Sequence, residues 1–137
     1  MKNKINIAQI GVGYWGPNLL RNIVGNENCE VNIVVDLSKE RRSFVKTLYP
    51  SIKVSSKIKD VIDNDNIEAV IIATPVATHY ELAIQCLKSG KHVLVEKPIA
   101  TTVEETYQIG KLAKKNKLVA MVGHTFLYNS AVRYIKK

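Results

Sequence analysis

The sequence predicts an α/β fold with a doubly wound, mainly parallel sheet, and three observations support this prediction. Short apolar segments alternate with segments of helical periodicity along most of the 137 residues. A glycine-rich turn, Gly11-Val12-Gly13-Tyr14-Trp15-Gly16, joins the first apolar segment to the first helical one. The second apolar segment ends on an acid, Asp36. Strands that alternate with helices in this way form a sheet with both faces covered.

The first half of the chain is expected to contain two strand–helix units and a shorter third one. β-Branched apolar residues crowd into the strand segments, and apolar residues recur at helical spacing in the segments between them. The expected strands cover residues 4–10 and 30–35, with a further short piece around 52–54. The expected helices cover residues 17–25, 39–49 and 58–64.

The second half is expected to add three strands and two long helices. The strands cover residues 69–73, 92–95 and 119–122, and the helices cover residues 78–89 and 103–116. Capping boxes predict both helix starts, one formed by Thr78 with Glu81 and the other by Thr101 with Glu104. Gly90 predicts the end of the first of these helices, because glycine favours the position just past a helix.

The glycine-rich turn is typical of a site that binds the pyrophosphate of a dinucleotide. Glycines let the chain turn tightly and bring its backbone against a ligand. A helix that opens there presents unpaired N–H groups and its positive dipole end. The glycine pattern alone occurs by chance in many chains. Here the strand before it, the helix after it and the acid downstream all agree with it, so we expect Gly11, Gly13 and Gly16 to form such a site.

Asp36 lies 20 residues after Gly16, close to the distance expected of a carboxylate that binds the adenosine ribose. A carboxylate there accepts hydrogen bonds from ribose hydroxyls and repels a 2′-phosphate, so the expected cofactor is NAD, with NADP second. Asp36 could instead cap the helix that begins near Ser38. Arg41 and Arg42 lie one helical turn further on and could accept a phosphate, although a solvated helix face is the preferred interpretation.

The net charge of +8 does not indicate nucleic-acid binding. Basic residues are spread along the chain, with clusters at 111–117 and 133–137, and neither cluster is interleaved with the aromatic residues of a stacking surface. Lys111, Lys114 and Lys115 fit the solvated face of a helix. Nucleic acid is therefore not an expected partner.

The sequence also allows predictions of the cellular compartment and of metal binding. No apolar run approaches the ~20 residues that span a bilayer, and the first residues lack the apolar core of a signal peptide. We therefore expect a cytoplasmic protein without a membrane partner. Cys29 and Cys86 are isolated thiols without metal-ligand spacing, so neither a metal site nor a disulfide is expected. Both are interpreted as packing residues, with Cys86 on the inner face of a helix.

Three further segments follow strands at the edge of the sheet where the glycine-rich turn lies. They cover residues 73–79, 95–98 and 123–129. The first contains Thr74, Pro75 and His79, although a histidine in a first helical turn can simply be exposed. The second contains Glu96 and Lys97, which could instead form a solvated ion pair of little energetic value.

Together these segments resemble the Gfo/Idh/MocA oxidoreductases, namely the N-terminal dinucleotide-binding domain of that family. The resemblance covers essentially the whole chain. Its motifs are Gly11-Val12-Gly13-Tyr14-Trp15-Gly16, Asp36, Ala73-Thr74-Pro75 with Thr78-His79, Glu96-Lys97-Pro98 and Gly123-His124-Thr125-Phe126. Glu-Lys-Pro in register with the others is the most specific. Within the family the chain looks most like members that act on nucleotide-linked sugars, such as UDP-N-acetylhexosamine 3-dehydrogenases.

The resemblance implies which residues meet the cofactor and the substrate. The implied cofactor residues are Gly11, Gly13, Tyr14, Trp15 and Gly16 at the pyrophosphate, Asp36 at the adenosine ribose, and Thr74, Pro75 and His79 near the nicotinamide ribose. Glu96 and Lys97 would lie beside the nicotinamide, with Lys97 touching the substrate hydroxyl and the Lys97–Pro98 peptide in the cis form. His124 would lie near the nicotinamide or the substrate, so Lys97 and His124 are the implied catalytic residues.

The implied function is hydride transfer between a hydroxyl of a sugar or UDP-sugar and a nicotinamide cofactor. An ammonium group beside that hydroxyl would stabilise the alkoxide that develops as hydride leaves. The alternative function is a non-catalytic NAD(P)-binding module that senses the cofactor or serves as a partner subunit. A homo-oligomer is compatible with either function.

The resemblance also implies the domain boundaries. Residues 1–123 are expected to form the dinucleotide-binding domain, and residues 124–137 to begin the connection toward a C-terminal substrate domain that this chain lacks. Members of the family usually take an acid–base histidine from that second domain. Turnover by this chain alone is therefore not expected.

Overall fold

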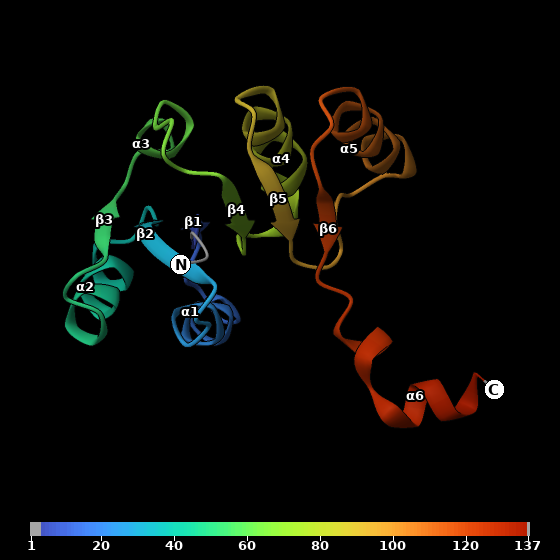
Figure 1. Cartoon of the computed structure of the whole chain (residues 1–137), viewed down its shortest axis with the longest axis horizontal. Coiled ribbons are helices and arrows are strands. Elements are labelled where there is room, and N and C mark those ends of the chain that lie inside the picture. The colour runs from blue at the N-terminus through green and yellow to red at the C-terminus, as the bar shows by residue number, and fades with distance from the viewer. Residues whose placement is uncertain (1–3, 137) are drawn as a thin grey trace.

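The computed structural model describes residues 4–136, which contain one six-stranded sheet. The strands are β1 (Ile5–Ile10), β2 (Cys29–Val35), β3 (Lys53–Ser55), β4 (Ala69–Ile72), β5 (His92–Val95) and β6 (Ala120–Val122). They lie in the order β3-β2-β1-β4-β5-β6, and every neighbouring pair is parallel. This order confirms the predicted doubly wound sheet, because the chain moves outward in both directions from the junction of β1 and β4 (Figure 1).

Helices lie on both sides of the sheet, as Figure 1 shows. One side carries α1 (Gly16–Val24) and α2 (Lys39–Leu48), and the other carries α3 (Lys59–Ile62), α4 (His79–Lys88) and α5 (Val103–Lys115). The short helical turns η1 (Val76–Thr78) and η2 (Thr125–Tyr128) precede α4 and α6 (Ser130–Ile135). After β6, η2 and α6 extend away from the sheet.

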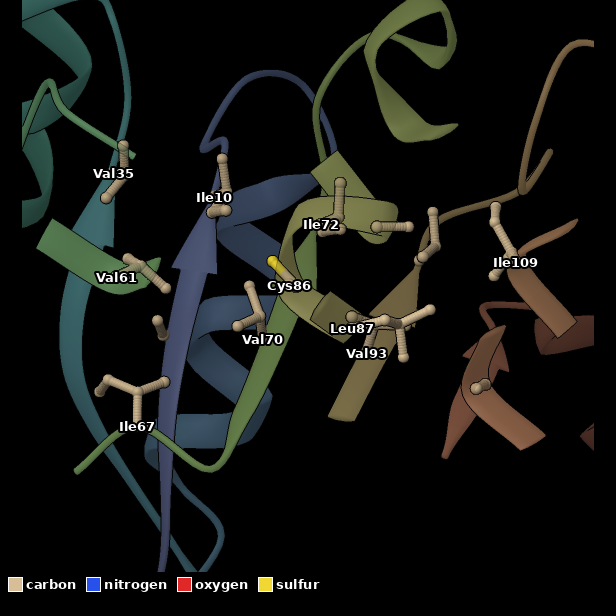
Figure 2. Packing of buried hydrophobic residues seen from close by; sticks show 14 of the residues in the cluster. Ile10, Val35, Val61, Ile67, Val70, Ile72, Cys86, Leu87, Val93 and Ile109 are labelled. Atoms are coloured by element: carbon tan, nitrogen blue, oxygen red, sulfur yellow. The ribbon is translucent and has the colours of Figure 1, made fainter. Parts of the chain in front are cut away.

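Alternate residues of the strands enter two separate apolar clusters. In β2, Ile33 and Val35 belong to the cluster that also contains residues of α3, α4 and α5, whereas Val34 belongs to the cluster that contains residues of α1 and α2. This alternation follows from the strand pleat, which points successive side chains to opposite faces. Figure 2 shows the larger cluster, in which Cys86 of α4 packs among strand residues, as predicted. Cys29, at the start of β2, is only half-buried.

The start of α4 differs from the prediction. The capping box expected of Thr78 and Glu81 is not formed, and α4 has no side-chain cap. An N-cap residue needs extended backbone, whereas Thr78 has φ −102° and ψ −9° because η1 precedes the helix. Its hydroxyl donates instead to the carbonyl oxygen of Pro75 at 2.8 Å. The predicted end of the helix is confirmed, since Gly90 follows with φ +78°.

The capping box of α5 is formed one residue later than predicted. It consists of Thr102 and Glu105, rather than Thr101 and Glu104. The helix begins at Val103, and the capping residue must directly precede the first helical residue. Hydrogen bonds from Thr101 and Thr102 to the Glu105 carboxylate lower the pKa of that carboxyl.

The remaining boundaries agree with the sequence prediction to within two residues at each end. The short strand expected around 52–54 is β3, at one edge of the sheet. Within residues 4–136, no helix combines the length and the apolar character needed to cross a bilayer.

Candidate dinucleotide site

The backbone of the turn between β1 and α1 has space for glycine alone at two positions. Gly11 has φ +92°, and a Cβ on it would lie 2.6 Å from the carbonyl oxygen of Ala73. A Cβ on Gly16 would lie 2.6 Å from the carbonyl oxygen of Gly11. A Cβ on Gly13, by contrast, would meet no atom within 4 Å. Gly11 and Gly16 therefore allow the chain to close the turn, while Gly13 leaves its outer side open.

Gln9, near the end of β1, holds the two ends of this turn together. Its side chain is fully buried, and Nε2 donates to the carbonyl oxygens of Gly11 at 2.9 Å and Gly16 at 2.8 Å. We did not predict this role from the sequence. The available signal was a polar residue near the end of a largely apolar strand, two residues before the first glycine, because a buried amide needs hydrogen-bond partners.

Asp36 joins the glycine-rich turn to the loop that follows β2. Its Oδ2 accepts the backbone N–H of Val12 at 2.9 Å, and its Oδ1 accepts the backbone N–H of Ser38 at 2.8 Å. The N-cap of α2 is Ser38 rather than Asp36, because the Ser38 hydroxyl accepts the N–H of Arg41. Asp36 thus lies half-buried beside the turn, at the position from which it was expected to bind a ribose.

Arg41 and Arg42 differ in their surroundings. Arg41 is exposed, as expected of a solvated helix face. That expectation is wrong for Arg42, whose Nη1 donates to the carbonyl oxygens of Asp36 at 2.7 Å and Leu37 at 2.9 Å. The side chain reaches back over the first turn of α2, where the loop presents carbonyl groups that no helix bond uses.

The loop after β4 approaches the glycine-rich turn from the other side of the β1–β4 junction. The N–H of Ala73 donates to the carbonyl oxygen of Ile10 at 2.8 Å, which extends the pairing of the two strands into the loops. The hydroxyls of Thr74 and Thr78 form a hydrogen bond at 2.7 Å. Thr74 and Pro75 therefore lie in an ordered loop beside the turn.

His79 is buried, with 1% of its surface exposed, so its interpretation as an exposed first-turn residue is wrong. Its Nδ1 lies 2.8 Å from the carbonyl oxygen of Pro98, and its Nε2 lies 2.7 Å from the carbonyl oxygen of Thr74. The loop after β5 covers the ring, which the sequence of α4 alone does not reveal.

Glu96 and Lys97 follow β5 and differ in exposure. Glu96 is only 7% exposed, so the interpretation of both residues as a solvated ion pair is wrong. Its Oε2 accepts the N–H of Lys97 at 3.2 Å, and its Oε1 has no hydrogen-bond partner among the described residues. The Lys97 side chain is exposed, and the Lys97–Pro98 peptide is cis, as the resemblance implied.

These segments meet at a cavity of about 610 Å³ beyond the carboxyl ends of the strands. Its walls come from the turn after β1 and from the loops after β4, β5 and β6. The lining residues are Gly13, Tyr14, Trp15, Ala73, Thr74, Pro75, Glu96, Lys97, Thr125 and Phe126. The cavity thus combines an open backbone turn, an exposed ammonium group and a buried carboxyl group.

Seven of the predicted site residues line this cavity, and the others lie around it. Gly11 and Gly16 close the turn, Asp36 accepts a hydrogen bond from it, His79 contacts the loop after β4, and His124 is exposed on the loop after β6. Thr125 and Phe126 line the cavity, although we did not include them among the predicted site residues. The signal for them was the Gly-His-Thr-Phe motif, which places both just after a strand.

Most of the chain matches one family of known proteins. Residues 5–124 match the family model GFO_IDH_MocA, described as an oxidoreductase family with an NAD-binding Rossmann fold. The chain is 32% identical over 133 residues to the 2,7-anhydro-N-acetylneuraminate hydratase of Escherichia coli (strain K12), covering 97% of this chain and 35% of that protein. It is 29% identical over 140 residues to the scyllo-inositol 2-dehydrogenase (NADP(+)) of Bacillus subtilis (strain 168), covering 100% of this chain and 39% of that protein.

A solved structure also resembles the chain closely. The crystal structure of GenD2 from gentamicin A biosynthesis, in complex with NAD, matches with a TM-score of 0.89 and 25% sequence identity. The match covers 93% of this chain and 36% of that chain. The chain therefore spans between 35% and 39% of the length of these three proteins.

Proposed function

The chain belongs to the Gfo/Idh/MocA oxidoreductase family as an NAD-binding Rossmann domain, and we propose that it binds a nicotinamide dinucleotide for hydride transfer to or from a hydroxyl of a sugar or related polyol. The observation that supports this proposal best is the cavity that brings Gly13 together with Lys97. A turn open to a diphosphate and an ammonium group at one crevice are what dinucleotide-dependent oxidation of a hydroxyl needs.

The residues around the cavity fit the proposed cofactor. Gly13 leaves space where a backbone can approach a pyrophosphate, and α1 begins at the same turn with its unpaired N–H groups. We therefore assign the pyrophosphate to the backbone of Gly13, Tyr14 and Trp15. The unpartnered Oε1 of buried Glu96 is suited to accept a hydrogen bond from a ligand. The bound nicotinamide would supply the hydride acceptor or donor.

We propose NAD as the cofactor, with NADP second. The Asp36 carboxylate lies beside the turn, where it would repel a 2′-phosphate and accept hydrogen bonds from an unmodified ribose. Arg42, which could otherwise attract a phosphate, is bound to two backbone carbonyl oxygens. Relatives differ in this respect, since GenD2 was solved with NAD and the Bacillus subtilis relative is named for NADP(+).

Lys97 is the proposed catalytic residue at the substrate hydroxyl. Its side chain is exposed in the cavity, where an ammonium group would stabilise the oxygen that gains negative charge as hydride leaves. We place His124 near the substrate as well, because it directly precedes Thr125 of the cavity wall. An exposed lysine in the crevice also argues against a purely non-catalytic module, which would have no use for it.

We propose that residues 1–123 are the dinucleotide-binding domain and that residues 124–137 begin the connection to a substrate domain in a longer protein. The relatives compared here are more than twice as long as this chain. η2 and α6 carry large apolar side chains that are exposed, among them Phe126, Tyr134 and Ile135. A contiguous exposed apolar surface is typical of an interaction site, and packing against a second domain would bury it.

Calorimetric titration of the chain with NAD and with NADP tests the cofactor proposal directly. We expect the heat of binding of each nucleotide to fit a single-site model. The dissociation constant for NAD should be at least several-fold lower than that for NADP. If neither NAD nor NADP bound to the chain, the proposed function would be contradicted. The substrate class is tested on a longer protein that contains the second domain, by measuring NADH formation with a panel of UDP-sugars, free sugars and inositols.

A further inference from the structure

His79 connects the two loops that form one side of the cavity. Its ring lies between the loop after β4 and the loop after β5, with Nε2 at 2.7 Å from the carbonyl oxygen of Thr74 and Nδ1 at 2.8 Å from that of Pro98. Thr74 lines the cavity, and Pro98 directly follows the cavity residue Lys97. The ring itself is buried and does not line the cavity.

Both partners of the ring are backbone carbonyl oxygens, which can only accept hydrogen bonds. A neutral imidazole carries one N–H, so it can donate to one of these oxygens and must turn a lone pair toward the other. A protonated imidazole carries an N–H on each nitrogen and can donate to both. In either form the buried ring bridges the carbonyl groups of Thr74 and Pro98, and so holds the two loops at a fixed separation.

The charged groups on the surrounding elements are few. The loop 73–78 carries no ionisable side chain. The loop after β5 carries buried Glu96 and exposed Lys97, and the first turn of α4 carries exposed Glu81. Glu96 is thus the one buried carboxyl group on these elements.

We propose that His79 is a positioning residue whose buried ring fixes the separation of the Thr74 and Lys97–Pro98 loops, and thereby shapes the nicotinamide end of the cavity. This inference rests on the proposed function, which assigns the nicotinamide to the cavity beside Lys97. It replaces the expectation that His79 borders the cofactor directly. The adenosine end is assigned instead to the glycine-rich turn and Asp36, with which the ring forms no hydrogen bond among the described residues.

The positioning role is tested by three variants and two ligands. Asn in place of His79 can retain the bond to Pro98, Gln can retain the bond to Thr74, and Leu retains neither. We expect His79→Leu to weaken the affinity for NAD about tenfold, and the Asn and Gln variants to weaken it less, because each of these keeps one of the two hydrogen bonds. ADP, which lacks the nicotinamide end, should bind all three variants as it binds the wild type.

The control variant is His92→Gln, which changes a histidine at the opposite end of β5 and should leave the affinities for both ligands unchanged. Equal loss of ADP and NAD affinity in the His79 variants would indicate a general effect on the fold and overturn the positioning role. Unchanged NAD affinity would overturn it as well. A wild-type chain that binds neither ligand would instead contradict the proposed function.

Discussion

The carboxylate of Asp36 accepts the backbone N–H of Val12 at 2.9 Å, and this bond joins the end of β2 to the glycine-rich turn. Its other oxygen accepts the N–H of Ser38, so the carboxylate is oriented before any ligand arrives. A residue expected to select the ribose therefore also shapes the turn expected to bind the pyrophosphate. Preorganisation of this kind reduces the ordering cost that binding must overcome.

Substitution of Asp36 should accordingly weaken binding of both the adenosine ribose and the pyrophosphate. We expect Asp36→Ala to weaken NAD about tenfold or more and to narrow the preference for NAD over NADP, because the hydrogen bonds of a charged acceptor are lost and the repulsion of a 2′-phosphate disappears. Calorimetric titration with both nucleotides measures the two effects.

Asp65→Asn is the matched control, since it removes the same charge from an exposed residue in the loop before β4. It should leave both affinities unchanged. An Asp36→Ala chain with the NAD affinity of the wild type would contradict the ribose role of this residue.

The elements and their order could be predicted because they depend on local patterns. Each strand carries a run of apolar residues, each helix carries a periodic face, and Gly11 marks a turn that only glycine allows at φ +92°. These signals lie within a few residues of the feature that they predict. The prediction of the cavity-lining residues Gly13, Thr74 and Lys97 depended on the same local signals, together with the rule that parallel strands end at one edge.

The contacts between loops could not be predicted in the same way. Whether His79 is exposed or buried depends on the loop containing Pro98, which is 19 residues away in the sequence. The bond from Gln9 to Gly16 likewise depends on how the turn closes in space. The capping boxes predicted for α4 and α5 differ from the structure, because a preceding 3-10 turn or one residue of offset changes which side chain meets the free N–H groups.

Gly13→Ala should separate ligand binding from folding. A Cβ on Gly13 would meet no protein atom within 4 Å, so we expect an unchanged melting temperature. The added methyl group would occupy the space where the pyrophosphate approaches, so the affinity for NAD should fall about tenfold. Thermal unfolding and calorimetric titration of the same sample measure both quantities.

Two other glycines provide the comparison. Gly110→Ala lies in α5 with open space around it, and should stabilise the chain by up to about 1 kcal/mol without affecting NAD. Gly11→Ala should lower the melting temperature, since its Cβ would lie 2.6 Å from the carbonyl oxygen of Ala73. If Gly13→Ala bound NAD normally, the pyrophosphate could not lie against that residue.

Cys86 should be unreactive in the folded chain. Burial raises the pKa of its thiol from an ordinary value of 9.0 to about 12, while the charge of Lys91 acts in the opposite direction. Because the thiolate is the nucleophile, a chromogenic disulfide reagent at pH 8 should modify half-buried Cys29 and leave Cys86 intact until a denaturant is added. In a Cys29→Ser variant, only Cys86 can react with the reagent. Rapid modification of Cys86 in this variant under native conditions would show that α4 opens readily.

The same raised pKa predicts how stability depends on alkaline pH. The folded state holds the Cys86 proton up to about pH 12, whereas the unfolded state releases it near pH 9.0. The stabilising contribution is therefore fully present below pH 9 and is lost as the pH rises from there toward 12. Denaturant unfolding of the wild type and of Cys86→Ala across this range should give curves that converge at high pH.

Lys97→Ala should separate cofactor binding from chemistry in a longer protein that contains the substrate domain. The Lys97 side chain is exposed in the cavity, so NAD affinity and melting temperature should change little. Removal of a group that stabilises a developing alkoxide and relays its proton should lower kcat about 100-fold or more. Lys97→Arg keeps the positive charge but not the compact ammonium group, and is expected to recover only part of this loss.

Steady-state assays with saturating NAD measure the effect, with Lys111→Ala on the exposed face of α5 as the control. Turnover in Lys97→Ala equal to that of the wild type would mean that another group meets the substrate hydroxyl, and would leave this domain with cofactor binding as its only part in the reaction.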